Sequence, residues 1–189
     1  MTLFEYLAVS VSIVLSFGVI RMLDGIPQAF ASGRRYWVHS LWVVNLLWMH
    51  VQLWWAFWSY SVRTSWNYPR FLIVLLGPAL LYSLAITLVP RDAADVPSWS
   101  AHFKLVRVRF HILFALLVCS LVLSTWLVLG LPFLSQLRAW QAFLIGLFVV
   151  GARFPSNRIQ GAVAIAYLAM LAYSAVGGFF EPAPLLPDG

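Results

Sequence analysis

Six stretches of about twenty residues, each with hardly any charge, constrain the fold of this sequence more than any motif does. They cover approximately residues 3–22, 37–60, 71–89, 110–130, 132–152 and 159–180. A helix of about 20 apolar residues crosses a bilayer core of about 30 Å with its backbone groups bonded internally. The sequence therefore predicts an all-α integral membrane helix bundle of about six transmembrane helices, forming a single transmembrane domain over residues 1–189.

Composition agrees with lipid as the main solvent. The chain is 62% hydrophobic and 10% charged, whereas a soluble domain carries about 25% charged residues. Too few polar side chains are present to cover a water-soluble globule of this size. A soluble enzyme and a disordered tail are thereby excluded, and the single cysteine, Cys119, excludes a disulfide scaffold.

The fifth stretch departs from this pattern. Gln136, Arg138 and Gln141 interrupt its first half, so a tilted or partly re-entrant segment is an alternative to a full span. We expect the long side chain of Arg138 to extend to the outer membrane surface.

Basic residues are distributed unevenly over the connections between the stretches. With six spans, three lie on the side of the two termini: Arg63, Arg70 and Arg138. Nine lie on the opposite side: Arg21, Arg34, Arg35, Arg91, Lys104, Arg107, Arg109, Arg153 and Arg158. Because cytoplasmic loops carry the excess of positive charge, we expect both termini on the outer side. This asymmetry explains much of the net charge of +6, so we expect no nucleic-acid partner.

Polar side chains share one face of the first stretch. Glu5, Ser12 and Ser16 are spaced by seven and four residues, and Arg21 and Asp24 are three apart and can pair at the cytoplasmic end. One interpretation is a polar path for a cation. The other is that the serines let helices approach closely, while the two charges form an interfacial pair.

The second stretch carries Asn45, His50 and Gln52 among aromatic residues. Asn45 and Gln52 are seven apart and share a face, and His50 falls near the membrane midplane. A polar residue at this depth is a functional candidate. His50 suits a proton relay, a metal or haem ligand, or a hydrogen bond to a neighbouring helix.

Three further histidines, His39, His102 and His111, fall at comparable depth near the cytoplasmic boundary. Two imidazoles on facing helices would suit a b-type haem, and three would suit a metal site. Haem b is therefore the cofactor of the alternative interpretation, whereas the main interpretation needs no cofactor.

Small and helix-breaking residues mark the later stretches. Gly77 and Pro78 predict a kink or hinge near mid-membrane, because proline removes a backbone donor and clashes with the preceding turn. Small residues predict close helix contacts that suit a homo-oligomer. They are Ala142, Gly146, Ala162, Ala166 and Ala169.

These features favour a homo-oligomeric membrane protein that lets a small ion or solute pass. Glu5, the two serines, the Arg21/Asp24 pair, Asn45, His50 and Gln52 would contribute to the path. The alternatives are a haem- or metal-binding redox module and a non-catalytic scaffold subunit. No Walker loop, GxSxG, HExxH or potassium-filter motif is present, so no catalytic residue is assigned.

Two runs, FEYLAVSVSIVLSFGVIRMLDG and HSLWVVNLLWMHVQLWWAFWSY, resemble a family of small, uncharacterised bacterial multi-pass membrane proteins. The resemblance continues through LGPALLYSLAITLVP and covers about the first ninety residues. It implies a location in the bacterial inner membrane and assigns no binding or catalytic residue.

Overall fold

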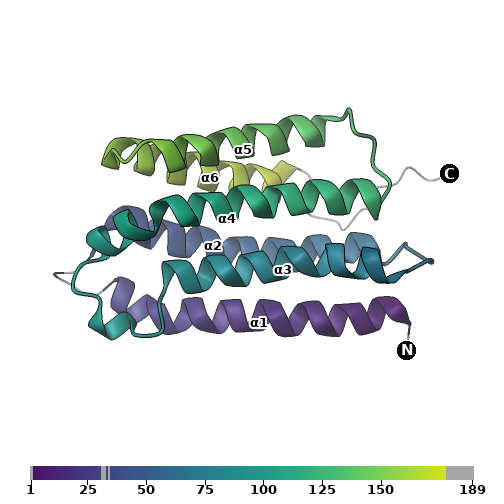
Figure 1. Cartoon of the computed structure of the whole chain (residues 1–189), viewed down its shortest axis with the longest axis horizontal. Helices are drawn as coiled ribbons and strands as arrows, with labels where there is room; N and C mark the ends of the chain where they lie inside the picture. The colour runs from purple at the N-terminus through teal and green to yellow at the C-terminus, as the bar shows by residue number, and fades with distance from the viewer. Residues whose placement is uncertain (1, 31–32, 34, 178–189) are drawn as a thin grey trace.

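The computed structural model describes residues 2–30, 33 and 35–177 (Figure 1). These residues form six α-helices and two 3-10 turns, without a strand. The helices are α1 (Leu3–Ala29), α2 (Trp37–Phe57), α3 (Tyr68–Leu88), α4 (Trp99–Leu127), α5 (Gln136–Arg153) and α6 (Asn157–Gly177); the turns are η1 (Trp58–Tyr60) and η2 (Ala93–Asp95). The predicted all-α fold is confirmed for this part of the chain. Arg34 and the last three residues of the sixth predicted span lie outside the described residues.

Consecutive helices run antiparallel in one bundle (Figure 1). We call the end where α1, α3 and α5 begin the amino-terminal end, and the opposite end the basic end. The basic end carries eight of the nine basic residues assigned to it by sequence, and Arg34 lies outside the described part of the chain. The predicted charge asymmetry is therefore present in the folded chain.

The helices pack as a ring in the order α1, α3, α4, α5, α6, α2. α1 packs on α2 and α3, α4 packs on α3 and α5, and α6 packs on α2 and α5. α2 also contacts α3 and α4, so it faces the middle of the bundle. α1 and α5 lie at opposite edges (Figure 1).

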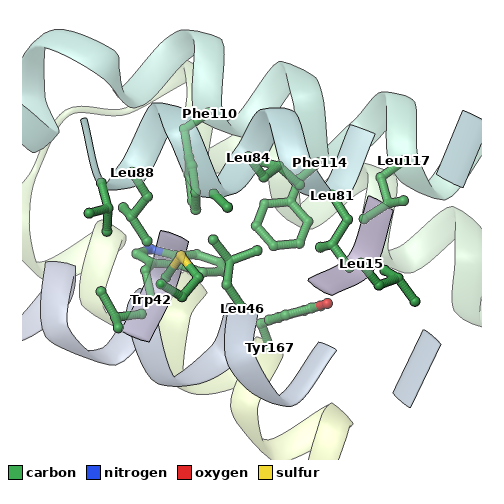
Figure 2. Packing of buried hydrophobic residues seen from close by; sticks show 14 of the residues in the cluster. Leu15, Trp42, Leu46, Leu81, Leu84, Leu88, Phe110, Phe114, Leu117 and Tyr167 are labelled. Atoms are coloured by element: carbon green, nitrogen blue, oxygen red, sulfur yellow. The ribbon is translucent and has the colours of Figure 1, made fainter. Parts of the chain in front are cut away.

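Aromatic side chains fill the core beside α2. Trp42 lies within 6 Å, centroid to centroid, of the rings of Phe110, Phe114 and Tyr167. Figure 2 shows these rings beside leucines of α2, α3 and α4. All four aromatic residues are buried. This aromatic layer fills the core between the middle of the bundle and the basic end.

Several helices differ in length from the apolar stretches that predicted them. α4 begins at Trp99, eleven residues before the predicted span, because the Ser98 side chain caps it by accepting a hydrogen bond from the Ala101 amide at 3.4 Å. α1 continues beyond residue 22 to Ala29. Hydropathy marks the membrane core, whereas caps decide where a helix begins and ends.

Four helices, α1, α3, α4 and α6, are long and apolar enough to cross a membrane, with mean hydropathies of 2.1, 2.3, 2.2 and 1.7. Tryptophans and polar residues lower the hydropathy of α2, and α5 has 18 residues and a length of about 27 Å. α5 is one continuous helix alongside α4 and α6, and a full fifth span stays a prediction.

Two glycines allow a neighbouring histidine to approach a helix backbone. A Cβ atom at Gly18 of α1 would lie 2.2 Å from Nε2 of His50, and one at Gly151 of α5 would lie 2.6 Å from His111. Neither residue belongs to the small-residue faces predicted from sequence. Of those predicted residues, Ala166 is half-buried and the other four are exposed, so they present an outward surface.

We expect Gly18→Ala to destabilise the protein by about 1–3 kcal/mol, because the added methyl group would overlap the His50 ring. Gly146→Ala is the matched control, since no atom lies within 4 Å of an added Cβ there and alanine favours a helix. Thermal unfolding in nanodiscs measures both effects. Equal melting temperatures for the two variants would contradict the close approach of His50 to α1.

Candidate functional site

The serines predicted on α1 lie at the edge of the bundle, where Ser12 accepts a hydrogen bond from Trp54 Nε1 on α2 at 3.2 Å. Ser16 is exposed and Ser12 is half-buried, while Leu7, Val11 and Leu15 form the buried face. Ser16 donates a hydrogen bond to the backbone oxygen of Ser12 at 2.7 Å. A single chain therefore does not enclose these serines in a path.

The charged residues of α1 have local structural roles. Glu5 completes a capping box with Thr2, in which the Thr2 amide donates to Glu5 Oε2 at 2.8 Å. Arg21 Nε donates to the backbone oxygen of Val89 at 3.1 Å, and Asp24 is exposed. The predicted Arg21/Asp24 pair is wrong, because the end of α3 provides Arg21 with an acceptor.

Asn45 and Gln52 join α2 to α6. Asn45 Nδ2 donates to the backbone oxygen of Ala164 at 3.0 Å, and Gln52 Nε2 donates to that of Leu171 at 3.1 Å. Their shared face, predicted from the spacing of seven, is thus the face toward α6. Hydrogen bonds of this kind hold membrane helices together.

His50 lies on another face of α2, against α1. Its Nδ1 donates to the backbone oxygen of Leu46 in its own helix at 2.7 Å, which leaves Nε2 as an acceptor. That Nε2 is buried without a hydrogen-bond partner and approaches Gly18. His50 and Asn45 therefore do not share one polar wall.

His39 and His102 cap the carboxyl end of α3. His39 Nε2 donates to the backbone oxygen of Leu88 at 3.0 Å, and His102 Nε2 donates to that of Thr87 at 3.3 Å. Their ring centroids lie 6.3 Å apart. The last carbonyl groups of a helix have no partner within it, so these side chains fill that need.

The third histidine belongs to a similar arrangement at the end of α5. His111 Nε2 donates to Gln160 Oε1 at 2.9 Å, and Gln160 Nε2 donates to the backbone oxygen of Gly151 at 2.8 Å. Arg107 also donates to that oxygen, at 2.8 Å, and to the backbone oxygen of Ala152. No group of three metal-binding side chains occurs among the described residues. The histidine geometry supports helix capping, because the Nε2 atoms that a haem iron would take are already bonded.

A cavity of about 820 Å³ lies in the amino-terminal half of the bundle. Its walls come from the carboxyl-terminal halves of α2, α4 and α6 and the amino-terminal halves of α3 and α5. Most lining side chains are aliphatic or aromatic, and the exposed rim residues Trp55, Gln136 and Trp140 show that the cavity reaches the surface. Phe114 and Tyr167 form its floor, next to the aromatic layer.

Gly77 and Pro78, the predicted hinge, are buried and line this cavity. α3 continues through both residues as one helix from Tyr68 to Leu88. Side-chain atoms nearest to an added Cβ at Gly77 lie at 3.9 Å, so a Cβ atom would fit there in ordinary van der Waals contact. Hinge motion at this point stays a prediction.

Few polar groups reach the cavity, and some of them have no partner in the described residues. Tyr60 and Ser124 share a hydrogen bond between their hydroxyl groups. Tyr167 is 3% exposed, and its hydroxyl makes no hydrogen bond within the described residues. In Figure 2 this oxygen points away from Trp42, toward the side where Leu117 lies.

Arg138 lies beside the cavity but is not among the residues that line it. Its Nη1 donates to Thr125 Oγ1 at 2.6 Å and to Gln141 Oε1 at 2.7 Å, and both of these residues line the cavity. Oxygens of Thr125 on α4 and Gln141 on α5 bond its guanidinium near the start of α5, and the extension of Arg138 to the outer membrane surface stays a prediction. Its Nε and Nη2 are buried without partners.

Of the predicted path residues, Gln52 lines the cavity, whereas Ser12, Ser16, Asn45 and His50 do not. Sequence reasoning missed Tyr60, Ser120, Ser124, Thr125 and Tyr167. The polar residues that weakened the fifth stretch were the available signal, because Gln136 and Gln141 line the cavity. Comparison with protein-family models, curated proteins and solved structures found no match to this chain. A function must therefore be argued from the cavity itself.

Two tyrosines of the cavity provide a matched test of its polar groups. We expect Tyr60→Phe to cost about 1 kcal/mol of stability, because it removes the hydrogen bond to Ser124. Tyr167→Phe is expected to leave stability unchanged, since its hydroxyl makes no such bond within the described residues. Thermal unfolding of both variants checks this, and an equal loss in Tyr167→Phe would show a partner for that hydroxyl.

Proposed function

We propose that this chain is a six-helix membrane protein that binds a single-chain amphiphile in its amino-terminal cavity. The observation that carries the proposal is the 820 Å³ cavity, whose walls are mostly apolar and whose exposed rim includes Gln136 and the tryptophans Trp55 and Trp140. Sites for small molecules have volumes of about 300–1,000 Å³, apolar walls and a few placed polar groups. The cavity has these properties.

The depth of the polar groups favours an amphiphile over a polar solute. Gln136 and Arg138 lie in the first turn of α5, at the amino-terminal end, whereas Phe114 and Tyr167 lie deeper. The side chains that line an empty cavity lack dispersion contacts on one side. A hydrocarbon chain in the cavity would supply those contacts along the apolar walls. The head group would then lie near the membrane interface.

The proposal includes a topology of six membrane-spanning helices with the amino-terminal end outside the cytoplasm. Four helices already qualify as spans, and α2 and α5 are packed against them over their lengths. Basic residues at the opposite end support an amino-terminal end that faces out of the cytoplasm. The sequence resemblance supports a bacterial inner membrane.

Passage of a small ion or solute through an oligomer is a second proposal. The observation that favours it is the outward position of Ser12 and Ser16, which a second copy could cover. The exposed small residues Ala142 and Gly146 lie on α5, at the opposite edge from α1 (Figure 1). A symmetric dimer through those residues would leave the two α1 helices apart. Protein-dependent ion flux in liposomes is expected for this second function and would not follow from amphiphile binding.

Filling the cavity tests amphiphile binding. In phosphatidylcholine nanodiscs, we expect a dibrominated fatty alcohol to quench tryptophans that line the cavity, namely Trp48, Trp55 and Trp140. Because Gly77 lines the cavity, the ring added by Gly77→Phe would take up cavity volume, so the apparent affinity is expected to fall about tenfold.

Gly146→Phe is the matched control for this substitution, because Gly146 is exposed on the outside of α5. It should bind the alcohol as the unmodified protein does. Circular dichroism confirms that both variants fold. Equal quenching in the unmodified protein and in folded Gly77→Phe would show that the alcohol occupies only the surrounding lipid.

Cysteine labelling tests the orientation. In a Cys119→Ser background, we expect a cysteine at Ser65 to react with a membrane-impermeant maleimide in intact cells, because the loop between α2 and α3 lies at the outer end. A cysteine at Ser156, between α5 and α6, should react only after the cells are opened. The reverse pattern would invert the proposed topology.

A further inference from the structure

We propose that the ligand of the cavity carries an oxygen atom near the inner end of its hydrocarbon chain, and that the Tyr167 hydroxyl donates a hydrogen bond to this oxygen. This inference rests on the proposed function of the cavity. Three observations support it: the direction of the hydroxyl, its lack of a protein partner in the described residues, and the apolar side chains at its depth.

Packing fixes the direction of the Tyr167 side chain. Its ring centroid lies 5.2 Å from that of Phe114, 5.5 Å from that of Phe148 and 5.6 Å from that of Trp42. The residue is 3% exposed and lines the cavity. In Figure 2 its oxygen points away from Trp42, toward the side of Leu117, which is another lining residue. The three neighbouring rings therefore hold the hydroxyl in the direction of the cavity.

The Tyr167 hydroxyl differs from the other buried hydroxyl groups of the lining. Tyr60 and Ser124 share a hydrogen bond, and Ser120 Oγ donates to the backbone oxygen of Leu117 at 2.7 Å. The Tyr167 hydroxyl makes no hydrogen bond within the described residues. Its oxygen is not one of the unpartnered polar atoms that these residues enclose completely, so the cavity reaches it. An unbonded hydroxyl in apolar surroundings is unfavourable, and an oxygen of the ligand would satisfy it.

The apolar side chains around this hydroxyl favour a ligand oxygen over a water molecule. At the depth of Tyr167, the lining residues of α4 are Phe114, Leu117 and Val118. A water molecule inside a protein is held by about three polar partners, and these side chains offer none. A ligand oxygen needs the Tyr167 donor alone, because apolar contacts hold the rest of the chain.

The depth of Tyr167 places the oxygen far from the head group. Phe114, which contacts the Tyr167 ring, and Thr125 both line the cavity. They are eleven positions apart on α4, which is a rise of about 16 Å. Thr125 bonds Arg138 in the first turn of α5, so it marks the outer level of the cavity. A head group at that level leaves most of the chain between itself and the oxygen that Tyr167 binds.

This hydrogen bond distinguishes the cavity from the surrounding lipid. The hydrocarbon core of a bilayer supplies no donor to a carbonyl or hydroxyl oxygen. In the cavity, Tyr167 supplies one at the level where the chain ends. The ligand class is therefore a single-chain amphiphile with a carbonyl or hydroxyl oxygen near the end of its chain.

The experiment compares two dibrominated fatty alcohols of equal length by tryptophan quenching in phosphatidylcholine nanodiscs. One of them carries a keto group near the end of its chain. The unmodified protein is expected to bind the keto alcohol about tenfold more tightly, because the keto oxygen accepts from Tyr167. Tyr167→Phe removes only the hydroxyl oxygen, so it should bind both alcohols about equally, and circular dichroism confirms that it folds.

Tyr82→Phe is the matched control, because Tyr82 is half-buried on α3 and does not line the cavity. It should keep the full preference for the keto alcohol. A third alcohol, with the keto group beside the head group, tests the depth of the interaction and should bind no more tightly than the alcohol without a keto group. Equal binding of the two keto alcohols would overturn the assignment to the inner end of the cavity.

The outcomes separate this inference from the proposed function. If no alcohol quenches the cavity tryptophans beyond the lipid background, amphiphile binding itself is wrong. If the alcohols quench but bind equally, or if Tyr167→Phe keeps the preference for the keto alcohol, the cavity binds chains and Tyr167 does not bond an oxygen of the ligand.

Discussion

The need to satisfy helix carbonyl groups where water is scarce accounts for much of this structure. At the basic end, α1, α3 and α5 all terminate, and side chains from other helices bond their last carbonyls. Trp99 donates to the backbone oxygen of Gln28 at 2.8 Å, and His39 donates to that of Leu88 at 3.0 Å. Arg107 serves α5 in the same way. Histidine, tryptophan and arginine donors thus hold one end of the bundle closed.

The amino-terminal half is organised differently. Its walls are mostly apolar, a cavity separates the helices, and the aromatic layer around Trp42 forms the boundary with the closed end. The bundle thus divides into an end where side chains bond the last helix carbonyl groups and a half that leaves a cavity between the helices. Arg138 lies in the second half, where Thr125 and Gln141 accept hydrogen bonds from its guanidinium.

Individual residues show how far sequence reasoning reached. The spacing of Asn45 and Gln52 correctly placed them on one face of α2, because helix geometry is local. The spacing of Arg21 and Asp24 allowed an ion pair that does not form, because the carbonyl of Val89 comes from a helix far along the chain. Sequence reasoning likewise gave no sign that Thr125 on α4 accepts a hydrogen bond from Arg138. Both missed contacts concern a partner from another helix.

The sequence alone determined an all-helical chain with long apolar helices and one basic end. It could do so because hydrophobic length and charge are properties of single segments. Tertiary structure alone decided which glycines admit a neighbour, which histidines cap a helix, and where the bundle leaves space. Those features depend on side chains brought together from distant segments, such as His50 against Gly18 or Gln141 beside Thr125. No local periodicity encodes them, because they arise from the packing of one helix surface on another.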